Sequence, residues 1–178
     1  MHDISKVRSA TIRFCDGLSV DGYQMPDGSY AVSITSASEA LGFAKNWLGR
    51  SIDRSGNTFK ALQEKGFSGK TEQVVAPSLG GDQKAKLITL KDFNRVILFA
   101  ASKGKDEALA LADALLNMSM VDFFRNVFGD RPLTIDEKRQ NFYRAYAESL
   151  SREDWLEMDR IDVMIIDNHL RFVGELAE

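Results

Sequence analysis

The sequence contains few of the residues that disulfide-rich and zinc-binding proteins need. It has one cysteine, Cys15, and two histidines, His2 and His169, which lie at opposite ends of the 178 residues. A single thiol excludes an intramolecular disulfide framework, and one thiol with two distant imidazoles is too few for a Cys/His zinc site. We therefore expect a protein of a reducing compartment that holds neither a metal nor another cofactor.

Prolines and long apolar runs are scarce as well. Three prolines and thirteen glycines, beside 44% hydrophobic residues, exclude the collagen-like, low-complexity and disordered classes. No stretch approaches the roughly 18 apolar residues of a membrane-spanning helix, and residues 1–13 contain no apolar run of signal-peptide length. The sequence thus predicts a folded cytoplasmic protein that does not interact with membranes.

Charge is nearly balanced in total but is unevenly distributed along the chain. The formal net charge is −3, whereas residues 45–70 contain six basic and two acidic residues, a local charge of +4. Residues 148–178 contain three basic and nine acidic residues, a local charge of −6. Because local charge determines binding to phosphate, the first segment favours a nucleic-acid partner. The acidic end suits a protein partner or simply solvates the chain.

The first third of the chain has the pattern of β-structure. β-Branched and aromatic residues predict strands at 9–15 and 18–23, and a turn at 25–28 allows the second strand to pair with residues 29–34. Further short strands are predicted at 72–76 and 86–89, with a loop at 77–82 between them.

Helices follow the first hairpin. Ser36 with Glu39 predicts a capped helix that Gly42 ends, and residues 44–52 form a second amphipathic helix, so that the pair resembles a helix-turn-helix. A third helix is predicted at 57–65.

From Thr89 onward the sequence predicts mainly helices. The first is capped by Thr89, and the next, at 106–128, has apolar positions on more than one stripe, which predicts burial on two sides. Thr134 and Glu137 form a capping box for a helix that runs to residue 150. Residues 161–176 fit two strands or a helix, and we favour strands. The fold class is α+β, with an α+β domain at 1–104 and a helical module with an acidic tail at 105–178.

The basic segment is the strongest functional signal. A helix across residues 45–54 presents Lys45, Asn46, Arg50 and Arg54 outward, and Lys60 follows on the next helix. Lysine and arginine contact phosphates, while asparagine pairs with adenine and arginine with guanine. The alternative is an ordinary solvated helix face.

Aromatic residues are interleaved with these bases. Trp47, Phe59 and Phe67 have the composition of a stacking surface for single-stranded nucleic acid, but their helical spacing favours packing in the core.

Motifs for enzymatic chemistry are incomplete. Residues 66–71 end like a phosphate-binding P-loop, but Glu64 stands where that loop needs its first glycine. A metal-dependent nuclease remains an alternative. The metal-binding carboxylates of such a nuclease would come from residues 136–138 or from Asp159, Asp162 and Asp167. Acids at 136 and 137 also have an ordinary explanation, because the helix dipole favours acids in the first turn of a helix.

The long helix at 106–128 has more apolar surface than one sheet can cover. Phe142 and Tyr146 of the following helix account for part of it, and Met118, Phe124 and Val127 remain for a second copy. Because homo-oligomers most often close as twofold dimers, the sequence predicts a homodimer.

Four short motifs occur in a fixed order along the chain. They are DGSYAV at 27–32, ALGFAKN at 40–46, LITLKDF at 87–93 and AASKGKDEA at 100–108. This order resembles the Bro-N / KilA-N-like amino-terminal domain of bacteriophage antirepressors over residues 10–128. The remainder is similar to a cyanobacterial subgroup associated with mobile elements.

The resemblance implies a regulator without catalytic residues that binds double-stranded DNA, or that interferes with a repressor through protein contacts. Dedicated duplex binders often have a pI above about 9, whereas the pI here is about 5.5. A protein-binding inhibitor that acts through the acidic tail therefore remains the main alternative.

Overall fold

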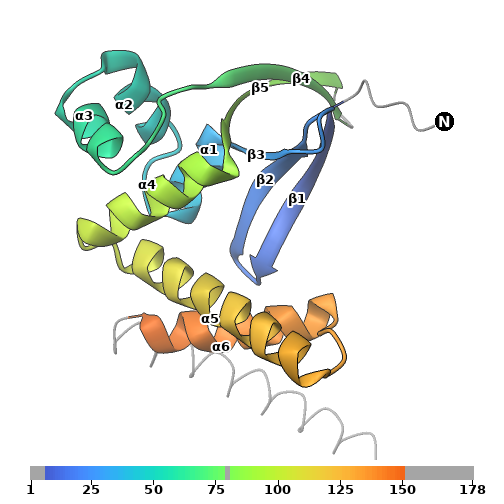
Figure 1. Ribbon diagram of the computed structural model, residues 1–178. Helices are drawn as coiled ribbons and strands as arrows, with labels where there is room; N and C mark the ends of the chain where they lie inside the picture. The colour runs from blue at the N-terminus through green and yellow to red at the C-terminus, as the bar shows by residue number, and fades with distance from the viewer. Residues whose placement is uncertain (1–6, 79–80, 151–178) are drawn as a thin grey trace, which may run out of the picture.

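The computed structural model describes residues 7–78 and 81–150. An antiparallel five-stranded sheet is formed by the first 89 residues, interrupted by three short helices, and three longer helices follow (Figure 1). The α+β class and the mostly helical second half that the sequence predicts are therefore confirmed. The predicted elements at 151 and beyond, including those at 161–176, lie outside the described residues.

The amino-terminal strands form the predicted hairpins. Strand β1 (Arg8–Cys15) pairs with β2 (Leu18–Gln24), and β2 pairs in turn with β3 (Tyr30–Ser33). The turn between β2 and β3 closes through Gly28, whose φ of +85° lies in the left-handed region that glycine adopts without strain. The hairpin that proline and glycine predict at this turn is thus confirmed.

Strands β4 (Glu72–Ser78) and β5 (Gly81–Thr89) complete the sheet, whose order is β1-β2-β3-β5-β4. Both strands are longer than predicted, and the loop expected at 77–82 is wrong, because the antiparallel pairing continues through Pro77 opposite Asp82. Proline is tolerated there because β4 is an edge strand, where an N–H is not needed for a second neighbour.

Three short helices separate β3 from β4: α1 (Ile34–Ala40), α2 (Trp47–Arg54) and α3 (Asn57–Glu64). The predicted cap at Ser36 is wrong, because Ser33 caps α1. The Ser36 hydroxyl is used inside the fold. It donates to the carbonyl of Ser33 (3.3 Å) and accepts from a backbone N–H of β2 (2.9 Å).

The second helix of the predicted pair starts later than expected. Residues 44–46 form a turn in which the N–H of Trp47 donates to the carbonyl of Ala44 (2.8 Å), so α2 begins at Trp47. Lys45 and Asn46 therefore precede the helix to which their spacing assigns them, and Asn46 is its N-cap residue.

The second half contains α4 (Leu90–Ser102), α5 (Asp106–Phe128) and α6 (Ile135–Ser149). Helices α5 and α6 lie side by side below the sheet (Figure 1). The capping box before α6 is confirmed: the Thr134 hydroxyl accepts from the N–H of Glu137, and the Glu137 carboxylate accepts from the N–H of Thr134.

Helix α5 is buried along its first half only. Ala108, Leu111 and Ala114 are fully buried, whereas most of the apolar side chains from Leu116 onward are exposed. Burial on two sides, which the sequence predicts for the whole helix, is therefore wrong. Helix α5 packs on α4 and α6, which leave part of its apolar surface uncovered. The exposed side chains are those of Leu116, Met120, Phe123, Phe124, Val127 and Phe128.

One hydrophobic core joins the sheet to the helices. It extends from Cys15 on β1 to Phe142 on α6, and the rings of Phe14 and Phe142 stack with centroids 5.5 Å apart. Next to this contact, the Arg139 guanidinium donates to the carbonyl of Arg13 (3.2 Å). Helix α6 is thereby attached to β1.

Candidate nucleic-acid interface

The predicted DNA-contacting residues are all exposed, but they do not all lie on one helix. Arg50 and Arg54 lie one turn apart on the outer face of α2. Lys45 and Asn46 lie at the amino-terminal end of α2, and Lys60 lies on α3. The structure thus brings four of the five residues to α2 and the turn that precedes it.

The inner face of α2 fixes which side chains point outward. Leu48 is fully buried, and Trp47 stacks on Phe43 with centroids 3.8 Å apart and nearly parallel planes. Because these contacts hold one side of the helix against the core, Arg50 and Arg54 remain on the opposite side.

A buried serine locks α2 to α1. The hydroxyl of Ser38 donates to the carbonyl of Ile34 (2.8 Å) and accepts from the backbone N–H of Leu48 (3.2 Å). That N–H is one of the first-turn donors that have no partner within their own helix. Sequence reasoning missed Ser38, and the available signal was a small polar residue on an otherwise apolar face of α1.

The turn between α1 and α2 is clamped by the junction of α4 and α5. The Lys105 ammonium donates to the carbonyl of Gly42 (3.1 Å) and lies 4.7 Å from the centre of the Phe43 ring. Gly42 has a φ of +72°, and a Cβ atom there would come within 2.9 Å of the Glu107 carboxylate. A side chain at this position would be strained by the positive φ and would displace the Glu107 carboxylate, so glycine is favoured.

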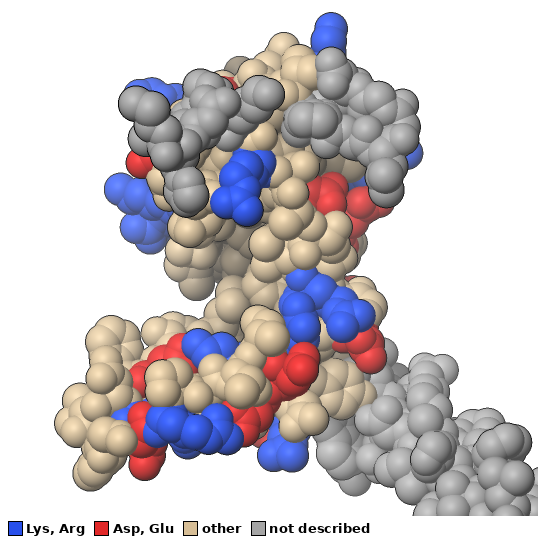
Figure 2. Space-filling view, turned by 90° about the vertical axis from the view of Figure 1, so that its right-hand side faces the viewer, with Lys and Arg blue, Asp and Glu red and all other residues tan. Residues whose placement is uncertain are grey.

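Three basic side chains at or near α6 form ion pairs, whereas the candidate basic side chains of α2 and α3 form none in the described part of the chain. Asp53, an acid on α2, is bound by Lys86 of β5 at 2.8 Å, which offsets its charge. Lys86 was predicted only as a strand residue. Within the described ranges, none of the candidate basic residues forms an ion pair; they are Lys45, Arg50, Arg54 and Lys60. On the face in Figure 2, basic and acidic side chains instead alternate over the helical pair.

The P-loop-like segment has a structural role. The N–H of Ser68 donates to the buried carboxylate of Asp92 (2.8 Å), and the Ser68 hydroxyl also donates to it, so a protein carboxylate binds this loop. A Cβ atom at Gly69 would lie 2.7 Å from the ring of Phe59, which packs edge-on against the buried Phe67. The packing interpretation of these aromatic residues is confirmed.

The acids at the start of α6 are paired with basic residues. Asp136 binds Arg139 at 3.3 Å. A hydrogen bond from Arg131, followed by one from the backbone of Thr134, lowers the pKa of Glu137 from 4.5 to about 2. In the described part of the chain no group of three His, Cys, Asp or Glu side chains could hold a metal ion. The alternative nuclease set, Asp159, Asp162 and Asp167, lies outside the described residues.

The predicted dimer residues differ in their surroundings. Met118 is half-buried and packs on the core, whereas Phe124 and Val127 are exposed on the second half of α5. No helix between residues 7 and 150 is both long and apolar enough to span a bilayer.

The chain was compared with protein-family models, with curated proteins and with solved structures. None of the three comparisons returned a match.

Proposed function

We propose that this chain is a sequence-dependent DNA-binding regulator of antirepressor type, which contacts the duplex through α2 and α3. The observation that carries the proposal is a set of exposed basic side chains without acidic partners in the described structure, held on helices that are fixed to the core. Phosphate binding needs such cations, because an ion-paired cation must first lose its partner.

The dimensions and the first turn of α2 suit a duplex groove. Eight residues make a helix about 12 Å long, and the major groove is about 12 Å wide. Asn46 lies at the amino-terminal end where such helices contact base edges, and its side chain makes no capping hydrogen bond with α2. In this proposal Arg50 and Arg54 bind phosphates and Asn46 reads a base.

A dimer through α5 completes the proposal. The exposed face that includes Phe124 and Val127 is covered by a second copy, and the two basic surfaces then contact half-sites about 34 Å apart or a multiple of that spacing. Two such surfaces together supply affinity that one segment of charge +4 lacks.

The test is the salt dependence of DNA binding. Fluorescence anisotropy with a duplex selected from a random library compares the unchanged protein with Lys45→Ala/Arg50→Ala/Arg54→Ala. The plot of log affinity against log salt should become less steep by about 0.9 units for each phosphate that the variant no longer binds. The matched control, Arg131→Ala/Arg139→Ala/Arg144→Ala, removes the same charge from the region of α6 and should leave the slope unchanged. An unchanged slope in the first variant refutes the proposal.

The alternative is a protein-binding inhibitor that acts through the acidic end of the chain, and the charge of −6 over residues 148–178 favours it. Truncation after Leu150 would then abolish capture of a partner, while the α2 triple variant would still capture it. The DNA-binding proposal predicts the reverse dependence for duplex binding.

A further inference from the structure

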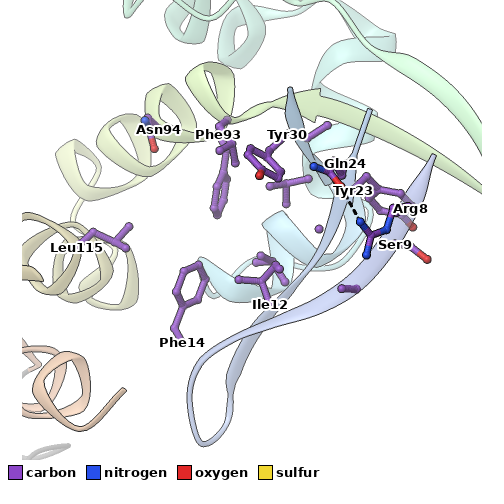
Figure 3. A pocket seen from close by; sticks show the side chains of 16 residues that line it. Arg8, Ser9, Ile12, Phe14, Tyr23, Gln24, Tyr30, Phe93, Asn94 and Leu115 are labelled. Atoms are coloured by element: carbon purple, nitrogen blue, oxygen red, sulfur yellow. Dashed lines mark hydrogen bonds between the residues drawn. The ribbon is translucent and has the colours of Figure 1, made fainter. Parts of the chain in front are cut away.

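A cavity of about 680 Å³ lies between the amino-terminal strands and helices α4 and α5 (Figure 3). This volume is typical of sites for small molecules. Its walls are mainly apolar, and they come from both sides of the fold: β1 to β3 supply Ile12, Phe14 and Val32, while α4 and α5 supply Leu90, Phe93 and Leu115.

Large apolar side chains of this cavity are accessible to water. Ile12 and Leu90 are each 44% exposed, and Tyr30 is 57% exposed. Gly22 is paired with Ala10 and lies diagonally from Ile12, and a Cβ atom at Gly22 would come within 2.5 Å of the Ile12 side chain. An occupant that covers these surfaces gains the free energy of removing apolar area from water.

One end of the cavity is basic. The Arg8 guanidinium donates to the amide oxygen of Gln24 on the neighbouring strand (3.3 Å), and Arg8 has no ion pair with any residue of the described ranges. In Figure 3, Arg8 and Gln24 lie at one end of the lining residues, whereas Phe14 and Leu115 lie away from them. Arg8 and Phe14 are six strand residues apart, a distance of about 20 Å.

We propose that this cavity binds a small amphipathic molecule with an apolar chain and a terminal carboxylate. The carboxylate binds Arg8, whose planar guanidinium matches it in a paired geometry, and the chain follows β1 toward Phe14. Charge complementarity selects a carboxylate over an uncharged or cationic head group. This inference does not depend on the DNA-binding proposal, because the cavity contains none of the basic residues of α2 and α3.

The experiment compares three probes of equal chain length by titration calorimetry: dodecanoate, dodecanol and dodecylammonium, each below its aggregation limit. Dodecanoate should bind at one site per chain, about tenfold or more tighter than the other two. Arg8→Gln should remove that preference and leave dodecanol affinity unchanged. Arg13→Gln, a matched change on the same strand at a residue that does not line the cavity, should keep the preference.

Filling the cavity supplies the second arm. Ile12→Trp and Leu115→Trp narrow it from opposite walls, and each should weaken dodecanoate at least tenfold in a protein whose circular dichroism is unchanged. Equal affinity for the three probes, retention of the preference in Arg8→Gln, or full binding in both tryptophan variants would overturn the proposal. A change in oligomeric state caused by Ile12→Trp in the absence of ligand would also overturn it. That result would mean that a second copy of the chain, and not a small molecule, occupies the cavity.

Discussion

Helices α2 and α3 differ from the α5–α6 pair in the kind of side chain that is left uncovered at the surface. Among the residues that the structure describes, basic side chains are left without ion pairs on α2 and α3, and apolar side chains are left exposed on α5. Around α6 three basic side chains form ion pairs: Arg131 with Glu137, Lys138 with Asp122 and Arg139 with Asp136. On α2 and α3 the candidate basic residues have no such partner in the described structure, and the apolar residues are packed inward.

The α5–α6 pair shows the opposite arrangement for apolar groups. Three ion pairs join its charged side chains, while Phe123, Phe124 and Val127 are exposed. The number of charged residues in a segment therefore does not indicate its partner. The proposals above rest instead on the groups that the fold leaves uncovered: basic side chains on α2 and α3 for an anionic partner, and apolar side chains on α5 for a second copy.

The largest expected effect is a difference in stability between variants of a buried and an exposed phenylalanine in the α5–α6 pair. Phe142→Ala removes a ring that stacks on Phe14 in the core, and it should lower the free energy of unfolding by about 3–5 kcal/mol. Phe123→Ala, at an exposed position, should change it by less than about 0.5 kcal/mol. Urea denaturation measures both, at protein concentrations low enough to keep the chain monomeric. Equal losses would show that Phe123 is buried in the folded monomer.

The next effect concerns the exposed face of α5. Phe124→Asp should weaken self-association by about 2 kcal/mol or more, because it puts a charge in an apolar interface. Light scattering at micromolar concentration should then give a monomer. Leu98→Asp, an equally drastic change at an exposed position of α4, is the control and should leave the mass unchanged. A monomeric mass for the unchanged protein would remove the dimer from the proposal.

A smaller effect tests how α2 is held. Ser38→Ala leaves the N–H of Leu48 buried without its acceptor, so stability should fall by about 1–3 kcal/mol and DNA affinity should fall with it. Ser51→Ala is the control, since its hydroxyl only donates to the carbonyl of Trp47, which α2 already uses. Thermal denaturation and anisotropy measure the two quantities. Similar losses in both variants would contradict a special role for Ser38.

The smallest effect is a pH dependence at α6. The folded-state pKa of Glu137 is lowered to about 2 from its ordinary value of 4.5, first by Arg131 and then by Thr134. The stabilisation is therefore complete above pH 4.5 and is lost as the pH falls through 2. The difference in stability between the unchanged protein and Glu137→Gln should be constant near neutral pH and should shrink over that range. A difference that grows on acidification would contradict the assignment.

Local signals predicted the elements whose partners are close in sequence. The capping box of Thr134 and Glu137 and the turn at Gly28 are determined by residues within three positions. The cap at Ser36 failed although the same spacing is present, because its hydroxyl serves a backbone N–H of β2 instead. A hydrogen bond between residues 15 positions apart overrode the local pattern.

The candidate interface also combines features set by local sequence with features set by residues far away in the chain. Its basic residues were identified from composition, since charge density is a property of the segment itself. Their outward orientation depends on Ser38 and Lys105, whose partners Leu48 and Gly42 are 10 and 63 residues away. No single-sequence pattern specifies such long-range hydrogen bonds.

The hydrogen bond from Lys105 to Gly42 has a consequence for local opening. Because the start of α5 holds the turn before α2, the backbone amides of these two segments are expected to lose protection together when this bond breaks. Amide hydrogen exchange would then register α2 and the first turn of α5 as one cooperative unit, although more than fifty residues of chain separate them.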